Sequence, residues 1–187
     1  MPPTAGSSTA EQPRFYYDLD SPEAYLLAER VLHALGDVPE WIPVQVSEVG
    51  PFRCAVEIDS YREDIERRAA ALGAMPLRWP DPFPADTRWA MLAATYAKSI
   101  GRGVAFSLAA FRQAFAAGRD LSERDNVLIA AAACEMHPAA LVKGAELRST
   151  REKLDAASAQ ARAEGVRSLP AIVIGGEVLH GERAIPA

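Results

Sequence analysis

The stretch RFYYDLDSPEAYLLAERV, residues 14–31, carries the clearest signals of secondary structure in the chain. Its first six residues are aromatic and compact and predict a strand. Asp20 and Ser21 are two candidate helix caps, and Pro22 follows them in a position that favours the first turn of a helix. Apolar residues then recur at helical spacing until Gly36. The stretch therefore predicts a strand that leads directly into a helix.

The rest of the chain extends this unit. Residues 41–46, WIPVQV, predict a second strand, and residues 171–174 and 177–180 predict a hairpin across Gly175-Gly176. Almost everything from about residue 57 to residue 164 has a helical pattern. The hairpin needs a sheet to join, and the other predicted strands lie near the beginning of the chain. We therefore predict an α/β fold in which a large all-helical insertion separates a β-α-β half from a C-terminal β-hairpin.

Composition limits the organisation and the function. A chain of 187 residues with 49% hydrophobic content is long enough for one sizeable core, so we expect a mobile leader over 1–13 and a single domain over 14–187. The net charge of −5 argues against a nucleic-acid partner. No apolar run approaches the roughly 20 residues that span a bilayer, and the first residues lack a signal-peptide pattern. We expect a cytoplasmic protein with no membrane partner.

The strand-to-helix junction is the first candidate site. Backbone N–H groups at a helix start and the helix dipole stabilise an anion there, and thiol oxidoreductases place a cysteine at this position. This chain has Ser21 instead, with Ala24 three residues later. A serine hydroxyl cannot be oxidised, but it can donate a hydrogen bond to a thiolate from another molecule. The alternative is that Ser21 is only an N-cap, worth about 1 kcal/mol.

The second candidate is Leu169-Pro170, which stands directly before the predicted hairpin. Proline belongs at the beginning of a strand because it cannot donate to the ladder. A cis bond at this place would turn the preceding backbone groups toward a cleft, where they could hold an extended peptide. In contrast, the two cysteines, Cys54 and Cys134, form neither a redox motif nor half of a zinc site, so we expect no metal.

Three segments together resemble a known family. They are FYYDLDSPEAYLLAERV (15–31), LRWPDPFPADTRWAMLAA (77–94) and GVRSLPAIVIGGEVLHGERAI (165–185). In this order they resemble the 2-hydroxychromene-2-carboxylate isomerase and kappa-class glutathione transferase group of the DsbA-like thioredoxin superfamily. The resemblance implies a thioredoxin-like fold. It also implies an isomerase or transferase that uses glutathione, or an equivalent low-molecular-weight thiol, on a small electrophilic, aromatic organic acid.

The resemblance also assigns roles to residues. Ser21 would be catalytic, by hydrogen-bonding the sulfur of the thiol, and the helical insertion would roof the pocket for the acceptor substrate. The residues expected at the cofactor are Ser21, Pro22, Leu169, a cis Pro170, Glu182 and Arg183. The residues expected in the substrate pocket are Tyr25, Trp79, Phe83 and Asp86.

Two alternatives remain open. Asp86 stands where the isomerases have an asparagine, and the altered loop at 49–54 carries Cys54, so a DsbA-family thiol-disulfide oxidoreductase that lacks the CxxC motif is the first alternative. A non-catalytic thioredoxin-fold binding protein is the second. His180 is the histidine close enough to the predicted thiol site to be worth testing. The resemblance also allows a homodimer, for which the sequence gives no interface.

Overall fold

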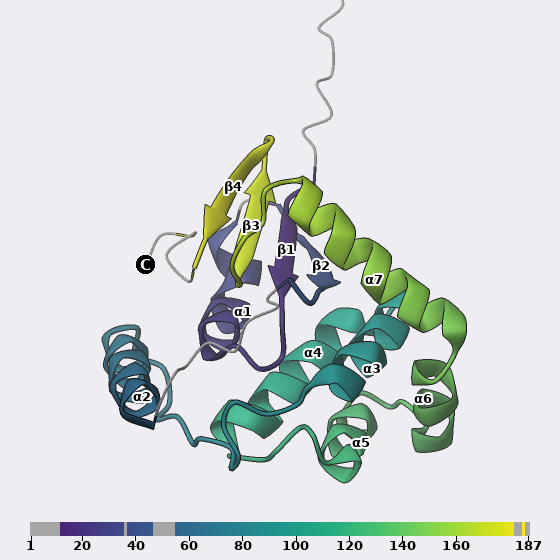
Figure 1. Ribbon diagram of the computed structural model, residues 1–187, viewed down its shortest axis with the longest axis horizontal. Helices are drawn as coiled ribbons and strands as arrows, with labels where there is room; N and C mark the ends of the chain where they lie inside the picture. Colours follow the sequence, from purple (N-terminus) through teal and green to yellow (C-terminus); the bar gives the residue numbers. More distant parts are fainter. Residues whose placement is uncertain (1–11, 36, 47–54, 182–184, 186–187) are drawn as a thin grey trace, which may run out of the picture.

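The computed structural model describes residues 12–35, 37–46, 55–181 and 185. In Figure 1 a small sheet lies at one end of the molecule and most of the helices at the other. The strands are β1 (Arg14–Tyr17), β2 (Glu40–Pro43), β3 (Ala171–Ile174) and β4 (Glu177–His180), and they lie in the order β2-β1-β3-β4. β2 runs parallel to β1, whereas β3 is antiparallel to both β1 and β4.

Register explains how the sheet is covered on both faces. Phe15 pairs with Trp41 on one side and with Ile172 on the other, and these three side chains belong to the larger hydrophobic core. Tyr16 is next along β1, and because side chains alternate along a strand it points to the opposite face. There it packs with Ala161 of helix α7 (Arg148–Ala163). The sheet therefore separates two hydrophobic cores.

The first helix, α1 (Pro22–Ala34), begins after Ser21, whose side chain accepts a hydrogen bond from the N–H of Ala24 at 3.1 Å. Pro22 occupies the first turn, where a missing N–H costs nothing. The helix ends at Ala34, and β2 then returns parallel to β1, which completes the β-α-β half.

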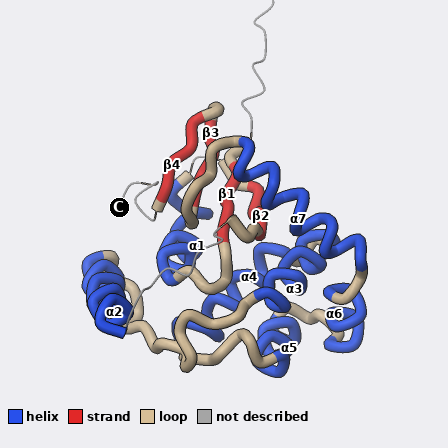
Figure 2. The backbone as a smooth tube through the Cα atoms, viewed as in Figure 1, coloured by secondary structure: helices blue, strands red, loops and turns tan. Residues whose placement is uncertain are grey.

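In the sequence, the remaining helices lie between β2 and β3. Figure 2 shows most of them gathered at the end of the molecule away from the sheet. α2 lies beside α1 at the edge of the molecule, and α7 runs back along the sheet. α4 continues into a π-helical turn over Arg112–Ala116. The helices are α2 (Ala55–Ala71), α3 (Arg88–Ser99), α4 (Gly103–Phe111), α5 (Arg124–Ala133), α6 (Pro138–Ala145) and α7 (Arg148–Ala163).

The predicted α/β fold with its helical insertion is confirmed. The strand bounds differ: β1 ends at Tyr17 rather than Leu19, because the chain turns at Asp18 and Asp20 before α1. None of the helices in the described ranges is long and apolar enough to cross a membrane.

Candidate active site

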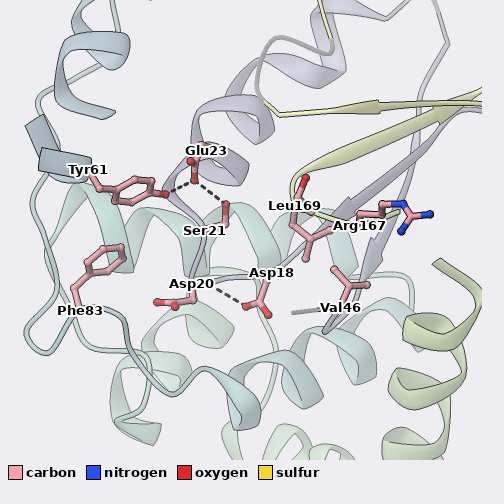
Figure 3. A pocket seen from close by; sticks show the side chains of 10 residues that line it. Asp18, Asp20, Ser21, Glu23, Val46, Tyr61, Phe83, Arg167 and Leu169 are labelled. Atoms are coloured by element: carbon pink, nitrogen blue, oxygen red, sulfur yellow. Dashed lines mark hydrogen bonds between the residues drawn. The ribbon is translucent and has the colours of Figure 1, made fainter. Parts of the chain in front are cut away.

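A cavity of about 380 Å³ lies where the end of β1, the first turn of α1 and the loop before β3 meet. This volume falls within the range of roughly 300–1,000 Å³ that is typical of small-molecule sites. Figure 3 shows that carboxylate side chains line one part of it and apolar side chains another. The lining residues are Asp18, Asp20, Ser21, Glu23, Val46, Tyr61, Phe83, Arg167, Ser168 and Leu169.

Ser21 lies at the wall of this cavity as the N-cap of α1. Its Oγ accepts the N–H of Ala24 and donates to Oε2 of Glu23 at 3.3 Å. The capping role that the sequence left as an alternative is therefore confirmed. A cap and a ligand contact are compatible, because a hydroxyl has one rotatable proton and two acceptor lone pairs. To donate to a bound sulfur, the hydroxyl proton has to turn away from Glu23.

Glu23 ties helix α2 to the first turn of α1. The phenolic oxygen of Tyr61 donates a short hydrogen bond to Oε2 of Glu23, and Nη2 of Arg68 lies 3.8 Å from Oε1. Burial and the negative charge of Glu23 raise the pKa of Tyr61 well above its usual range, so Tyr61 stays a neutral donor. These contacts hold an aromatic ring of α2 against the cavity.

The turn between β1 and α1 places two further carboxyls in the cavity. Oδ1 of Asp18 accepts the N–H of Asp20 at 3.1 Å and the hydroxyl of Thr87 at 3.0 Å. Loss of solvent raises the pKa of Asp18, although these hydrogen bonds oppose the effect. Oδ1 of Asp20 accepts the N–H of Ala85 at 3.0 Å, which joins the turn to the loop before α3.

Asp20 is a lining residue whose protonation responds near neutral pH. Burial raises its pKa to about 7, and the negative charges of Asp18, Asp120 and Asp86 add to the effect. The hydrogen bond from Ala85 opposes it. Asp20 is therefore divided between a carboxyl and a carboxylate at neutral pH, whereas an ordinary aspartate is fully ionised there.

Leu169 forms the opposite wall. The bond between Leu169 and Pro170 is cis, and β3 begins one residue later. Within the described ranges, the backbone N–H and C=O of Leu169 have no hydrogen-bond partner. The preceding loop is tied to β4, because the N–H of Arg167 donates to Nε2 of His180 at 3.2 Å. His180 thus orients the loop that carries Arg167, Ser168 and Leu169.

Aromatic rings form one apolar wall of the cavity, opposite Leu169 and Val46. Tyr61 and Phe83 are parallel, with 7° between their planes and 6.2 Å between their centroids. The ring of Trp79 packs at 4.8 Å from that of Phe83, and its Nε1 donates to Glu66. The guanidinium of Arg62 lies over both rings, 5.4 Å from Trp79 and 5.5 Å from Phe83. The arrangement provides a flat apolar wall that suits a planar ligand.

The structure brings together some of the predicted residues and not others. Ser21, Leu169 and Phe83 line the cavity, while the ring of Trp79 packs against that of Phe83. Tyr25 is not among the residues that line it: this side chain stacks on Phe115 and borders a separate cavity. It is 6% exposed in α1.

Other predicted residues lie outside the cavity or outside the residues that the structure describes. Asp86 is exposed, and its Oδ1 accepts the N–H of Arg88 at the start of α3. It acts on the site through its charge rather than as a lining residue. Glu182, Arg183 and Cys54 lie outside the described residues.

Sequence reasoning missed the acidic residues and Tyr61. Asp20 directly precedes Ser21 and Asp18 stands three residues before it, and the turn at the end of β1 places both at the cavity. Tyr61 belongs to the charged segment 61–68, which is typical of a solvated helix face, yet Tyr61 is half-buried and Ile65 is fully buried. The apolar residues at this four-residue spacing were the available signal.

Comparison with known proteins identifies the family. A model of the DSBA-like thioredoxin domain matches residues 14–187. No curated protein matches the chain.

Solved structures with the same fold include a 2-hydroxychromene-2-carboxylate isomerase, with 18% identity, a TM-score of 0.82, and coverage of 92% of this chain and 90% of that one. A probable DsbA oxidoreductase from Streptomyces coelicolor has 17% identity, a TM-score of 0.75, and coverage of 91% and 83%. The cytosolic disulfide reductase DsbM from Pseudomonas aeruginosa, in a structure with GSH, has 15% identity, a TM-score of 0.64, and coverage of 90% and 88%. At these identities the likeness shows the thioredoxin-like DsbA fold.

Proposed function

Because this chain belongs to the family of DSBA-like thioredoxin domains, we propose that it is an enzyme that binds glutathione, or an equivalent low-molecular-weight thiol, beside Ser21. The thiol adds to a small electrophilic, aromatic organic acid, and its departure after bond rotation gives an isomer. If the thiol remains attached, the product is a conjugate. The observation that carries the proposal is the meeting of Ser21 and Leu169 in one cavity.

The two walls of the cavity suit the two parts of such a thiol. Ser21 and the first turn of α1 offer a hydroxyl and the positive end of a helix dipole to a thiolate. Leu169 offers a backbone N–H and C=O that have no partner in the described part of the chain, and a peptide-like cofactor can pair with them. The cofactor residues Pro22, Pro170, Glu182 and Arg183 remain part of this proposal, as the resemblance implies.

The aromatic wall suits the acceptor. Phe83, which is 8% exposed, and Tyr61 present parallel rings to the cavity, and Trp79 fixes Phe83 in place. A planar conjugated acid can lie against them, with Arg167 at the cavity for its carboxylate. We expect a reaction in the cytoplasm, which is consistent with the cytosolic disulfide reductase among the similar structures.

Replacing Ser21 tests the thiol site. Ser21→Gly removes the hydroxyl but keeps a residue that caps helices almost as well, so the stability should fall by only a few tenths of a kcal/mol. We expect wild-type protein mixed with a panel of thiols, glutathione first, to show an ultraviolet thiolate band at neutral pH. In the variant the band should be lost, or the pKa of the bound thiol should rise by one to two units, about 1.4 to 2.7 kcal/mol.

The matched control is Ser99→Ala, which removes an exposed serine hydroxyl at the end of α3 that is not among the residues lining the cavity. This variant should keep the band. If no thiol in the panel gives a band with the wild type, or if Ser21→Gly keeps it unchanged, the proposed function is wrong.

A thiol-disulfide oxidoreductase that works through Cys54 is the second candidate, favoured by the DsbA-type structures with the same fold. Cys134 is a poor substitute, because it is buried at the end of α5 and burial raises its pKa. Loss of a measured disulfide-exchange activity in Cys54→Ser would support this candidate over the isomerase.

A further inference from the structure

The acidic lining of the cavity poses a problem for a bound thiolate. Three carboxyl groups, those of Asp18, Asp20 and Glu23, line the same space as Ser21. Like charges in a partly desolvated cavity disfavour each other, so an added thiolate would be repelled if all three were ionised. A thiolate is tolerated when at least one of these carboxyls carries a proton.

Of the three, Asp20 has the geometry for proton exchange with a ligand. Both carboxylate oxygens of Glu23 already face cationic or hydroxyl donors from α2, and Oδ1 of Asp18 accepts two hydrogen bonds, from the N–H of Asp20 and the hydroxyl of Thr87. Oδ1 of Asp20 accepts the N–H of Ala85, while Oδ2 has no hydrogen-bond partner within the described ranges. Figure 3 shows the Asp20 side chain on the cavity side of the turn, one residue before Ser21.

We propose that Asp20 is a catalytic residue that exchanges a proton with the bound thiol and with the acceptor. This role rests on the proposed function. The Asp20 carboxylate takes the proton of the thiol, so the cavity keeps the same total charge while the thiolate forms. The neutral Asp20 carboxyl then has a proton to return.

The remaining steps balance without an oxidant or a reductant. The acceptor has a carbon–carbon double bond conjugated to a carbonyl group. The thiolate sulfur forms a bond to the far carbon of that double bond, the electrons shift through the conjugated system to the carbonyl oxygen, and Asp20 donates its proton to that oxygen. Rotation about the former double bond follows. Asp20 then takes the proton back, the double bond re-forms, and the carbon–sulfur bond breaks to give the isomer and a thiolate, which takes the proton of Asp20 and leaves as the thiol.

Protonation of Asp20 near neutral pH supports this role, because a general acid or base is most effective when its pKa is near the working pH. The protonation of Asp20 depends on the charged and titratable groups around its side chain. Those that act on Asp20 or share its cavity are Asp18, Asp86, Asp120, Glu23, Tyr61 and Arg167.

The first test titrates the thiolate band of bound glutathione in wild type and in Asp20→Asn. The asparagine can still accept the N–H of Ala85 through its side-chain oxygen, but it cannot hold a titrating proton. In the wild type the thiol and Asp20 should titrate as a coupled pair, in two steps. In Asp20→Asn a single step at lower pH should remain, because a neighbouring negative charge is gone. An identical titration in both proteins would overturn the proposal.

The second test measures kcat against pH with glutathione and 2-hydroxychromene-2-carboxylate as probes. The wild type should give a bell-shaped profile, since the bound thiol and Asp20 must share a single proton. Asp20→Asn should lose the alkaline limb, and its kcat at neutral pH should fall by roughly 10²-fold. Asp155→Asn, the same change on the exposed face of α7, should behave as the wild type. Retention of the alkaline limb in Asp20→Asn would overturn the role.

The two hypotheses fail in different ways. If the thiolate band depends on Ser21 while Asp20→Asn leaves the titration and the profile unchanged, the thiol site stands and the role of Asp20 is wrong. If the band is absent with every thiol, or if the wild type shows no turnover, the proposed reaction is wrong and the role of Asp20 falls with it.

Discussion

Asp20 keeps a carboxyl group where water is largely excluded, so its ionisation destabilises the folded state. In the unfolded chain this group loses its proton near pH 3.8, whereas in the folded protein its pKa is raised to about 7. Between these two values the unfolded state binds fewer protons, and the free energy of unfolding falls as the pH rises. Above pH 7 the penalty is complete and stays constant.

We therefore expect Asp20→Asn to be more stable than the wild type above neutral pH. The gain should grow from about pH 4 to about pH 7 and then level off, reaching a few kcal/mol. Urea unfolding at several pH values measures it. Asp155→Asn should show no such pH-dependent gain, because Asp155 is exposed on α7. A stability difference that is the same at pH 4 and at pH 8 would contradict this expectation.

Some residues at the site could be predicted from the sequence and others could not. Ser21 was found from its place between a strand and Pro22, and Leu169 from the proline before a predicted strand, because both signals are local. Tyr61 was missed because its position depends on how α2 docks against α1, which is a tertiary contact. The surroundings of Tyr25 likewise depend on a tertiary contact, since its ring packs against Phe111 and Phe115 of the insertion.

At the scale of elements, helix α7 is joined to β1 by a cluster of polar side chains. Nη1 of Arg14 lies 2.7 Å from Oε1 of Glu164, and the hydroxyl of Tyr16 donates to Oε2 at 2.8 Å. Burial tends to raise the pKa of Glu164, but hydrogen bonds from Gln160, Tyr16 and Arg14 outweigh it and the pKa is lowered. The folded state therefore favours the carboxylate form of Glu164.

Removing the charge of Glu164 should weaken this junction. A group whose folded pKa is lowered stabilises the protein above its unfolded pKa, and the contribution is lost as the pH falls through the folded pKa. Glu164→Gln should thus be less stable than the wild type by about 1 kcal/mol at neutral pH, and the two should converge in acid. Chemical denaturation at both pH values measures the difference.

The control for this junction is Glu152→Gln, which breaks an exposed pair with Arg148 on the same helix. Its effect should stay below about 0.5 kcal/mol. A loss in Glu164→Gln that persists unchanged in acid would mean that packing, rather than charge, holds α7 to β1.

The elements themselves followed from periodicity better than their packing did. The predicted helix near 57–72 corresponds to α2 (Ala55–Ala71), and the predicted hairpin corresponds to β3 and β4, because their patterns and turn residues are strong. The position of α2 against α1 could not be predicted, because it depends on Glu23 reaching Tyr61 and Arg68. Side-chain contacts between two helices do not produce a periodic pattern in the sequence.

At the scale of the whole molecule, the helical block and the sheet share one core. Tyr17 of β1 lies with its ring centroid 5.7 Å from that of Phe111 on α4, and Tyr25 of α1 lies 6.3 Å from the same ring. On the sheet, Tyr17 also packs against Phe15 and Trp41. The larger hydrophobic core therefore runs without interruption from the strands into the insertion.

A continuous core predicts that the insertion and the sheet unfold together, so that damage in the insertion destabilises the whole protein. Phe111, which is 0% exposed, is the residue to change. Phe111→Ala should lower the free energy of unfolding by about 3–5 kcal/mol and keep a single transition, with the same midpoint by far-UV and near-UV circular dichroism. Ile129→Ala, at a side chain that is 50% exposed on α5, should cost less than about 0.5 kcal/mol. Two separate transitions in Phe111→Ala, with the sheet aromatics retained after the helices melt, would show that the insertion is an independent unit. The cavity around Ser21 takes residues from both the insertion and the α/β part, so motion of one relative to the other would then change its shape.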